Sequence, residues 1–366
     1  MRGSRPGTLV GRLTPLDTRL APTSFDERLD DTLLELLAEL EGGSLPRTGQ
    51  DLSIYGVLRY HLGYADEEFQ PASFDAGKRI RPRICLLACQ AAGGDVDQAF
   101  QVAAAIEMLH NFTLIHDDIQ DQSDLRRHRP TVWSIWKTAQ AINAGDALFA
   151  AAHLMLHRSL DAGLAAPVVL ELSRELHRTT LRIVEGQVLD LGFESRSDVR
   201  PEEYLTMISG KSAAIMRYAC FAGATVAGAP AGTVEHLAEF GQATGMAFQI
   251  RDDLLGVWQT TDETGKPAAD DIRRRKKSLP VLLLRDRLSD SDWETVTEIY
   301  RQNELDAGQI QYILDLMHRY EIRPVVQQRV EHWHDVAVSH LKAAVPASEA
   351  RTDLFELTEA LVDRRA

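Results

Sequence analysis

Apolar residues recur at three- and four-residue intervals along almost the whole chain, and this spacing limits the fold more than any other feature. The segment DERLDDTLLELLAELEGG (26–43) is typical, because its leucines share one helical face until Gly42 and Gly43 end the helix. A capping box of Ser24 and Glu27 opens that helix. Sustained period-two alternation, which marks half-buried strands, is not found, and neither is a fixed repeat of roughly 20–50 residues. The pattern predicts one all-α domain with a large central core, without a sheet or a solenoid.

No long linker interrupts the helical pattern between Phe74 and Ala344, and we expect a single all-α domain over residues 24–366. Residues 1–23 are rich in Arg, Gly, Pro and Thr and have little apolar periodicity, and they lack the apolar core of a signal peptide. We therefore expect a mobile N-terminal tail.

Charge and cysteine content exclude several classes of protein. The net charge of -14 disfavours nucleic acid and anionic membranes as partners. The three cysteines are too few and too sparse for a disulfide framework, which indicates a reducing compartment and a cytoplasmic location. Apolar runs stay shorter than the roughly 18–20 residues that span a bilayer, so we expect no stable membrane insertion.

Two aspartate pairs follow apolar helical stretches in different halves of the chain. LIHDDIQD (114–121) carries Asp117, Asp118 and Asp121, and FQIRDDLLG (248–256) carries Asp252 and Asp253. Asp117 and Asp121 are one helical turn apart on the same face. Carboxylates so close together repel each other unless a divalent cation binds them. Mg²⁺ typically takes a few carboxylate oxygens from the protein and completes its coordination shell with water and phosphate oxygens. The alternative is a solvated acidic helix face, which the apolar flanks disfavour.

Basic residues accompany the aspartates in four places, and each cluster alone could be a solvated face. They are GKRIRP (77–82), DLRRHRP (124–130), Lys211 after Gly210, and Lys266 with the run RRRKK (273–277). Together with the aspartate pairs they indicate two anion sites, one bridged by metal and one built from Arg and Lys.

These motifs resemble those of the trans-isoprenyl diphosphate synthases, the polyprenyl synthetase family. GKRIRP, HNFTLIHDDIQDQSDLRRHRPT, EGQVLDL, GKSA and FQIRDDLL occur in the family's order over roughly residues 74–285. The resemblance implies a helical bundle around a central cavity, usually in a homodimer. It also implies an Mg²⁺-dependent prenyltransferase with about three metal ions per site. Such an enzyme joins an allylic diphosphate to isopentenyl diphosphate and releases pyrophosphate.

The resemblance also assigns roles to individual residues. The metal ligands would be Asp117, Asp118, Asp121, Asp252 and Asp253. Isopentenyl diphosphate would be bound by Lys78, Arg81, His110 and Arg127. The allylic diphosphate would be held by Arg126, Lys211, Lys266 and Lys276. The reacting carbons would lie beside Gln187, Ser212 and Gln249, with Lys211 drawing charge from the leaving group.

Three positions depart from the family pattern. Gly256 replaces the last aspartate of the second motif, and Asp262, Asp270 and Asp271 are candidates to compensate for it. His128 stands where a glycine is usual. RRRKKSLP replaces a Gly-Lys-x-Thr run, so the choice of Lys276 over Lys277 depends on the register. Because the first aspartate motif does most of the metal ligation in that family, we expect activity to survive the change at Gly256.

Product length in such enzymes is set by bulky residues below the first motif. Phe112 and Thr113 stand five and four residues before Asp117, a pattern that resembles synthases of the twenty-carbon geranylgeranyl diphosphate. Helix arithmetic puts Thr113 under Asp117 but turns Phe112 away, so Phe112 as the floor rests on the resemblance. Farnesyl or longer-chain synthases, a class I terpene cyclase and a non-catalytic partner subunit are the alternatives.

Overall fold

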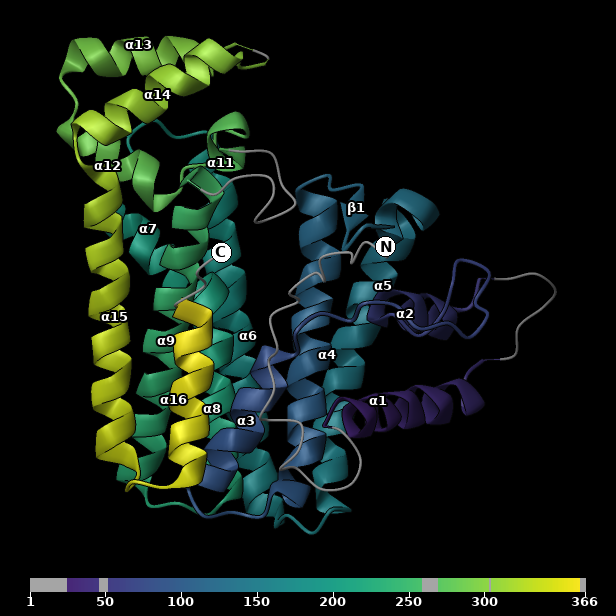
Figure 1. Cartoon of the computed structure of the whole chain (residues 1–366). Helices are drawn as coiled ribbons and strands as arrows, with labels where there is room; N and C mark the ends of the chain where they lie inside the picture. The colour runs from purple at the N-terminus through teal and green to yellow at the C-terminus, as the bar shows by residue number, and fades with distance from the viewer. Residues whose placement is uncertain (1–24, 46–51, 259–268, 303, 363–366) are drawn as a thin grey trace, which may run out of the picture. The chain divides into compact units, whose positions relative to one another are not determined.

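The computed structural model describes residues 25–45, 52–258, 269–302 and 304–362, and nearly all regular structure in these ranges is helical (Figure 1). The expected all-α fold is confirmed. Ser24 of the expected capping box, the expected tail (1–23), Asp262 and Lys266 lie outside the described residues. The chain divides into two compact units with the boundary between Phe74 and Asp75, and the single domain expected over 24–366 stays a prediction.

The first unit contains α1 (Phe25–Gly42) and α2 (Ile54–Leu62), which contact each other. Arg59 of α2 donates to Glu41 of α1 over 2.7 Å. Ser53 caps α2 by accepting from the Gly56 backbone N–H, and Gly63, with φ of 89°, ends it in the left-handed conformation that glycine favours.

The second unit holds the aspartate pairs and most of the basic clusters. Its first helices are α3 (Ile80–Ala91), α4 (Val96–Gln120), α5 (Val132–His157), the 3₁₀ turn η2 (Arg158–Leu160) and α6 (Ala166–Glu194). The middle of the unit consists of α7 (Pro201–Ile208), the π-helical turn η3 (Ser209–Ala213), α8 (Ala214–Val226) and α9 (Ala231–Trp258). Next come α11 (Asp270–Arg273), α12 (Leu279–Arg287), α13 (Asp290–Tyr300), α14 (Ala307–Arg319), α15 (Ile322–Ala344) and α16 (Glu349–Val362).

Helices α8 and α9 form the centre of this unit. α8 packs against α3, α4, α6 and α9, while α9 also packs against α15 and η3 (Figure 1). Their buried residues include many alanines and glycines, which let neighbouring backbones approach closely. None of the helices in the described part of the chain carries an apolar stretch long enough to cross a bilayer.

One short hairpin departs from the purely helical expectation. β1 (Leu125–Arg126) pairs antiparallel with β2 (Arg129–Pro130) between α4 and α5. The two turn residues, Arg127 and His128, have φ of 50° and 62°. A tight turn with both central residues at positive φ suits glycine, so His128 is strained at a position where glycine is usual in the family that the motifs resemble.

Glycines bring α6 and α9 unusually close to the π-helical turn. A Cβ atom on Gly186 of α6 would lie 2.3 Å from the Lys211 backbone nitrogen. A Cβ atom on Gly245 of α9 would lie 2.6 Å from Ala213 Cα. The turn is therefore held between two helices, and its Lys211 and Ser212 lie next to Gln187 and Gln249 on the pocket wall. π-helical turns of this kind often mark functional sites.

Candidate active site

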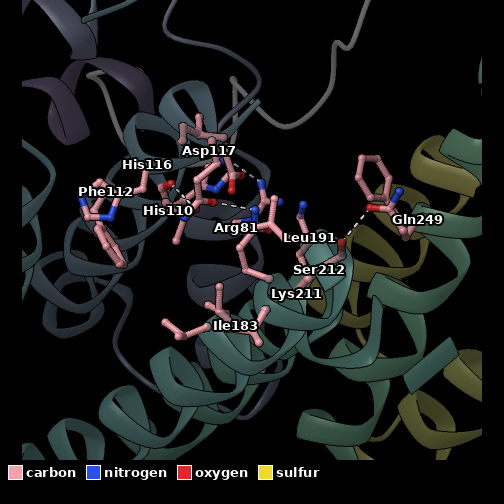
Figure 2. A pocket seen from close by; sticks show the side chains of 17 residues that line it. Arg81, His110, Phe112, His116, Asp117, Ile183, Leu191, Lys211, Ser212 and Gln249 are labelled. Carbon is pink, nitrogen blue, oxygen red and sulfur yellow. Dashed lines mark hydrogen bonds between the residues drawn. The ribbon is translucent and has the colours of Figure 1, made fainter. Parts of the chain in front are cut away.

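A cavity of about 370 Å³ lies among α4, α6, η3 and α9, with Arg81 of α3 also on its wall (Figure 2). Its lining residues are Arg81, His110, Phe112, Thr113, Leu114, His116, Asp117, Gln120, Ile183, Val184, Gln187, Val188, Leu191, Lys211, Ser212, Phe248 and Gln249. Nine of the predicted site residues are in this set. They are Arg81, His110, Phe112, Thr113, Asp117, Gln187, Lys211, Ser212 and Gln249. Apolar side chains such as Ile183, Val184 and Leu191 share its wall with polar and charged ones.

The first acidic segment, residues 117–121 at the end of α4, divides its aspartates between two tasks. Asp117 faces the cavity, and Asp121 is exposed at the C-cap. Asp118 is only 2% exposed and points the other way, where it accepts hydrogen bonds from Arg126 Nε at 2.9 Å and Nη2 at 2.7 Å. The hairpin thus supplies a bidentate partner for the buried carboxylate.

Burial raises the pKa of Asp117 to about 6. Lys211 and Arg126 lower this pKa, while Asp121 and Asp118 raise it. The carboxylate is therefore costly to keep charged where it stands, and a bound cation would remove that cost.

The π-helical turn brings a cation and a hydroxyl to the opposite wall. Lys211 Nζ donates to Asp190 Oδ2 of α6 at 2.5 Å. Ser212 Oγ donates to Gln249 Oε1 at 2.7 Å, as Figure 2 shows. Asp190 belongs to the EGQVLDL motif but was not predicted as a site residue.

The amide of Gln187 is oriented from α4. Its Nε2 donates to Gln120 Oε1 at 2.7 Å. Its Oε1 is buried and has no hydrogen-bond partner within the described part of the chain. A carbonyl oxygen held in this way presents partial negative charge to the cavity. Gln120 was missed by the sequence analysis, since it stands between the motif aspartates without a charge of its own.

The second acidic segment, residues 252–256 in the last turns of α9, resembles the first. Asp252 is exposed, whereas Asp253 is 1% exposed and heavily hydrogen-bonded. Tyr204 of α7 donates a short hydrogen bond to Asp253, and the Leu279 backbone N–H donates at 3.3 Å. Lys276 Nζ lies 3.4 Å from Asp253 Oδ1. Neither Asp252 nor Asp253 lines the cavity. Gln249, which does line it, donates a hydrogen bond to Asp253 at 3.4 Å.

The two adjacent lysines after α11 have different partners. Burial works against the charge of Lys276, but Asp253, Asp271, Asp252 and Asp190 outweigh it and raise its pKa. Lys277 instead donates to backbone carbonyls at the end of α6, including Glu194 O at 2.9 Å. This geometry supports Lys276 as the lysine next to the acidic residues, and Lys277 as a cap of α6.

A basic cluster surrounds a buried carboxylate beside the cavity. Arg81 Nη1 lies 3.1 Å from His110 Nε2, so the guanidinium donates and the neutral imidazole carries its proton on Nδ1. Burial lowers the pKa of Arg81 to about 10, and Glu107 opposes this. Glu107, 4% exposed, was not predicted; burial raises its pKa, while Arg79, Asn111, Arg81 and Arg127 lower it.

Arg127 reaches this cluster from the hairpin. Its guanidinium lies against Gly77, where a Cβ atom would come within 2.6 Å of Nη2. Burial lowers the pKa of Arg127, and Glu107 and Asp75 oppose this. Lys78 is exposed, and neither it, Arg126 nor Arg127 lines the cavity itself. The cluster has the charge of an anion site, with Glu107 as its internal counter-charge.

The residues present suit magnesium better than a preformed metal cage. Among the described residues no group of three His, Cys, Asp or Glu side chains is close enough to hold a metal ion by itself. Asp117, Asp121 and Asp252 nevertheless offer hard oxygens that accept no hydrogen bond from another described side chain, and burial raises the pKa of Asp117 although Lys211 and Arg126 oppose this. Mg²⁺ takes one or two carboxylates and completes its shell with water and substrate phosphates, so these donors fit it.

Aromatic rings pack around Phe112, which lines the cavity. The Phe112 ring lies 5.1 Å from that of Phe149 and 5.2 Å from that of His116. Behind them, His153 lies 4.6 Å from Phe149. Thr113 lines the same cavity as Phe112, although ideal helix arithmetic separates the two side chains.

Comparisons with known proteins identify the family of the chain. A model of the polyprenyl synthetase family matches residues 67–317, so the chain belongs to that family. It is 45% identical over 225 residues to a (2E,6E)-farnesyl diphosphate synthase of Mycobacterium tuberculosis. That match covers 62% of this chain and only 61% of the relative. It is 36% identical over 306 residues to a geranylgeranyl diphosphate synthase of the same organism, covering 84% of this chain and 85% of the relative.

A solved structure has a similar fold. It is a geranylgeranyl pyrophosphate synthase from Corynebacterium glutamicum, complexed with isoprenyl diphosphate and magnesium. The two chains superpose with a TM-score of 0.79 at 27% identity, over 96% of this chain and all of the other (100%).

Proposed function

We propose that this chain is a prenyltransferase that condenses isopentenyl diphosphate with an allylic diphosphate and releases pyrophosphate. The observation that carries the proposal is that Asp117 and Lys211 line one cavity, close enough for Lys211 to lower the pKa of Asp117, together with apolar side chains of α4 and α6. A carboxylate and an ammonium group in one cavity suit a metal-bound diphosphate, and the apolar side chains of the lining suit a hydrocarbon tail.

The metal is part of the proposal. Asp117, Asp121 and Asp252 would hold Mg²⁺, about three ions in all, which would draw charge from the leaving diphosphate. The sequence also predicts Asp118 and Asp253 as metal ligands. In this proposal they would instead orient Arg126 and Lys276, with which they form ion pairs. The relative from Corynebacterium glutamicum, which was solved with magnesium, supports the choice of metal.

The chain's own residues account for the remaining chemistry. Lys211, Arg126 and Lys276 would grip the allylic diphosphate, together with Lys266 outside the described residues. As the carbon–oxygen bond breaks, the Gln187 Oε1 and Ser212 Oγ atoms lie on the cavity wall to stabilise the allylic cation. Gln249 fixes the Ser212 hydroxyl. The basic cluster with Lys78, Arg81, His110 and Arg127 would bind isopentenyl diphosphate, whose double bond then attacks.

We propose geranylgeranyl diphosphate as the product, with Phe112 and its neighbour Phe149 as the floor. Farnesyl diphosphate is the second candidate, because a relative at 45% identity bears that name. Incubating the purified chain with MgCl₂, labelled isopentenyl diphosphate and dimethylallyl, geranyl or farnesyl diphosphate decides between them by the length of the product.

The same assay separates the other classes of protein. Consumption of isopentenyl diphosphate identifies a synthase, and pyrophosphate release from the allylic substrate alone identifies a terpene cyclase. Neither activity in a folded chain would contradict the proposal and indicate a partner subunit.

A second copy of the chain is the proposed partner. Large apolar side chains are exposed along α5, η2 and α6. They are Ile142, Leu154, Leu160, Leu170, Leu181, Val184, Val188 and Leu189. Val184 and Val188 also line the cavity, so a copy docked on this face would cover part of its wall. Light scattering after gel filtration tests this: the native chain should run as a dimer, and Leu181→Glu with Leu170→Glu as a monomer.

The cellular location is a proposal of the same kind. Cys85, Cys89 and Cys220 are all free and buried, and their pKa values are raised by burial, so they behave as small core residues. Free cysteines support a reducing compartment such as the cytoplasm.

A further inference from the structure

Gly256 leaves a space on α9 that another carboxylate fills. A Cβ atom on Gly256 would lie 2.7 Å from Asp271 Cγ and 2.8 Å from each of its carboxylate oxygens. Such distances are too short for real carbon contacts, so a side chain at position 256 and the present position of Asp271 exclude each other. Asp271 therefore stands where a side chain three residues after Asp253 would begin.

The short α11 holds Asp271 in this place. The helix starts after Ala269, whose φ of 56° turns the chain sharply. Ile272 is fully buried and anchors the helix, while Asp270 faces Arg274, to which it is joined by an ion pair of 3.2 Å. The Lys276 backbone N–H donates to Asp271 O at 2.9 Å and closes the next turn. The two adjacent aspartates thus have different surroundings.

The carboxylate of Asp271 lacks a full set of partners. Its Oδ2 is buried and has no hydrogen-bond partner in the described ranges of the chain. The hydroxyl of Ser278, a residue that is 0% exposed, lies beside the carboxylate and lowers its pKa. Asp252, Asp253 and Lys276 are its charged neighbours. A buried acceptor left in this state is uncommon, and it has capacity for a donor or a cation.

We propose that Asp271 supplies the third carboxylate of the second acidic segment, in place of the side chain missing at Gly256, and helps Asp252 to bind the magnesium that accompanies a diphosphate. The proposal rests on the function proposed above. It gives the second side of the site two available carboxylates from different helices, where α4 alone provides both on the first side. Magnesium needs few protein ligands when phosphate oxygens complete its shell, so two carboxylates suffice.

Binding of pyrophosphate in the presence of MgCl₂, followed by calorimetry on the full chain, tests the role of Asp271 without requiring turnover. Asp271→Asn keeps the shape but removes the charge, and we expect the apparent affinity for Mg²⁺ to fall about tenfold. Asp270→Asn is the matched control, because that aspartate faces Arg274, and it should stay within about twofold of the native chain.

A relocation variant makes the test sharper. Gly256→Asp combined with Asp271→Gly moves the carboxylate to the other helix, and we expect most of the lost affinity to return. Gly256→Asp alone should bind Mg²⁺ more weakly than the native chain, because the added side chain displaces the Asp271 carboxylate from its present position. Circular dichroism and thermal melting check that each variant is folded.

The outcomes separate this inference from the proposed function. Native affinity in folded Asp271→Asn, or an equal loss in Asp270→Asn, would overturn the role of Asp271. A folded relocation variant as weak as Asp271→Asn would overturn the claim that the two positions are equivalent. Failure of the native chain to bind pyrophosphate with Mg²⁺ would instead contradict the proposed function.

Discussion

The first and second acidic segments both present carboxylates to a metal-bound diphosphate in our proposal, but the carboxylates come from different structural elements. Each buries one aspartate against a cation, Asp118 against Arg126 and Asp253 against Lys276, and each leaves another aspartate available. The third carboxylate differs in origin, because Asp121 follows on α4 whereas Asp271 comes from α11. The comparison teaches that the aspartate pair is set by helical spacing, while the third ligand depends only on where tertiary structure places a carboxylate.

The available aspartates should give the largest effects. Asp117→Asn removes the carboxylate that lines the cavity together with Lys211, and we expect kcat/KM to fall by about 10³-fold. In Asp252→Asn, kcat/KM should fall less, by about 10²-fold, because the Asp271 carboxylate remains beside the second acidic segment. Steady-state assays with saturating MgCl₂ measure both. An equal loss in the two variants would break the proposed difference between the sides.

The buried aspartates differ in how many partners they keep. Arg126→Met leaves Asp118 without its bidentate partner, and we expect a loss of about 2–3 kcal/mol in unfolding free energy. Lys276→Met should cost about 1 kcal/mol, because Tyr204 and the Leu279 N–H still donate to Asp253.

Urea denaturation measures the effect of these two substitutions. Arg301→Met, which breaks an exposed ion pair with Glu298, is the control and should change stability by less than about 0.5 kcal/mol. A larger loss in Lys276→Met than in Arg126→Met would contradict this account.

Stability should depend on pH in the same way through Asp117, of the first acidic segment, and through Asp271, beside the second. Burial raises the pKa of each from 3.8 to about 6. The folded state then holds a proton more tightly than the unfolded state, so this contribution to stability is present below pH 4 and is lost as the pH rises through 6.

Without divalent cations, Asp117→Asn and Asp271→Asn should each be more stable than the native chain at pH 8, by about 1–3 kcal/mol. At pH 4 the advantage should disappear. Denaturation curves at both pH values in EDTA check this. A constant difference between variant and native chain at the two pH values would show that the carboxylates do not titrate as described.

Product length should change on substitution of Phe112, before the first acidic segment, but not on substitution of Phe248, before the second. Phe112 forms the ring contact with Phe149, and Phe112→Ala should lengthen the product by one or more isoprene units. Phe248, four residues before Asp252, lines the same cavity and gives a matched control. Phe248→Ala should leave the product length unchanged. Chromatography of the dephosphorylated products reads the result, and an unchanged product from Phe112→Ala would remove its role as the floor.

The sequence predicts the fold and much of the site because both follow local rules. Helical periodicity gives the helices, and i, i+4 spacing puts Asp117 and Asp121 on one face of α4. Charged motif residues such as Lys211 and Arg81 can be found because their chemistry is evident without coordinates.

The remainder depends on contacts between distant segments. The sequence leaves Asp262, Asp270 and Asp271 as equal candidates to replace the missing carboxylate, and only the position of α11 against α9 distinguishes Asp271 from Asp270. The inward turn of Asp118 depends on the hairpin, whose residues at positive φ no periodicity predicts. Glu107 was missed because a lone carboxylate in an apolar helix gives no signal until the arginines around it are placed.

Anomalous diffraction from crystals grown with MnCl₂ and pyrophosphate tests the central claim most directly. The account predicts Mn²⁺ ions bound to Asp117 on one side and to Asp252 and Asp271 on the other, with one pyrophosphate between them. Manganese bound at only one acidic segment, or at neither, would contradict it.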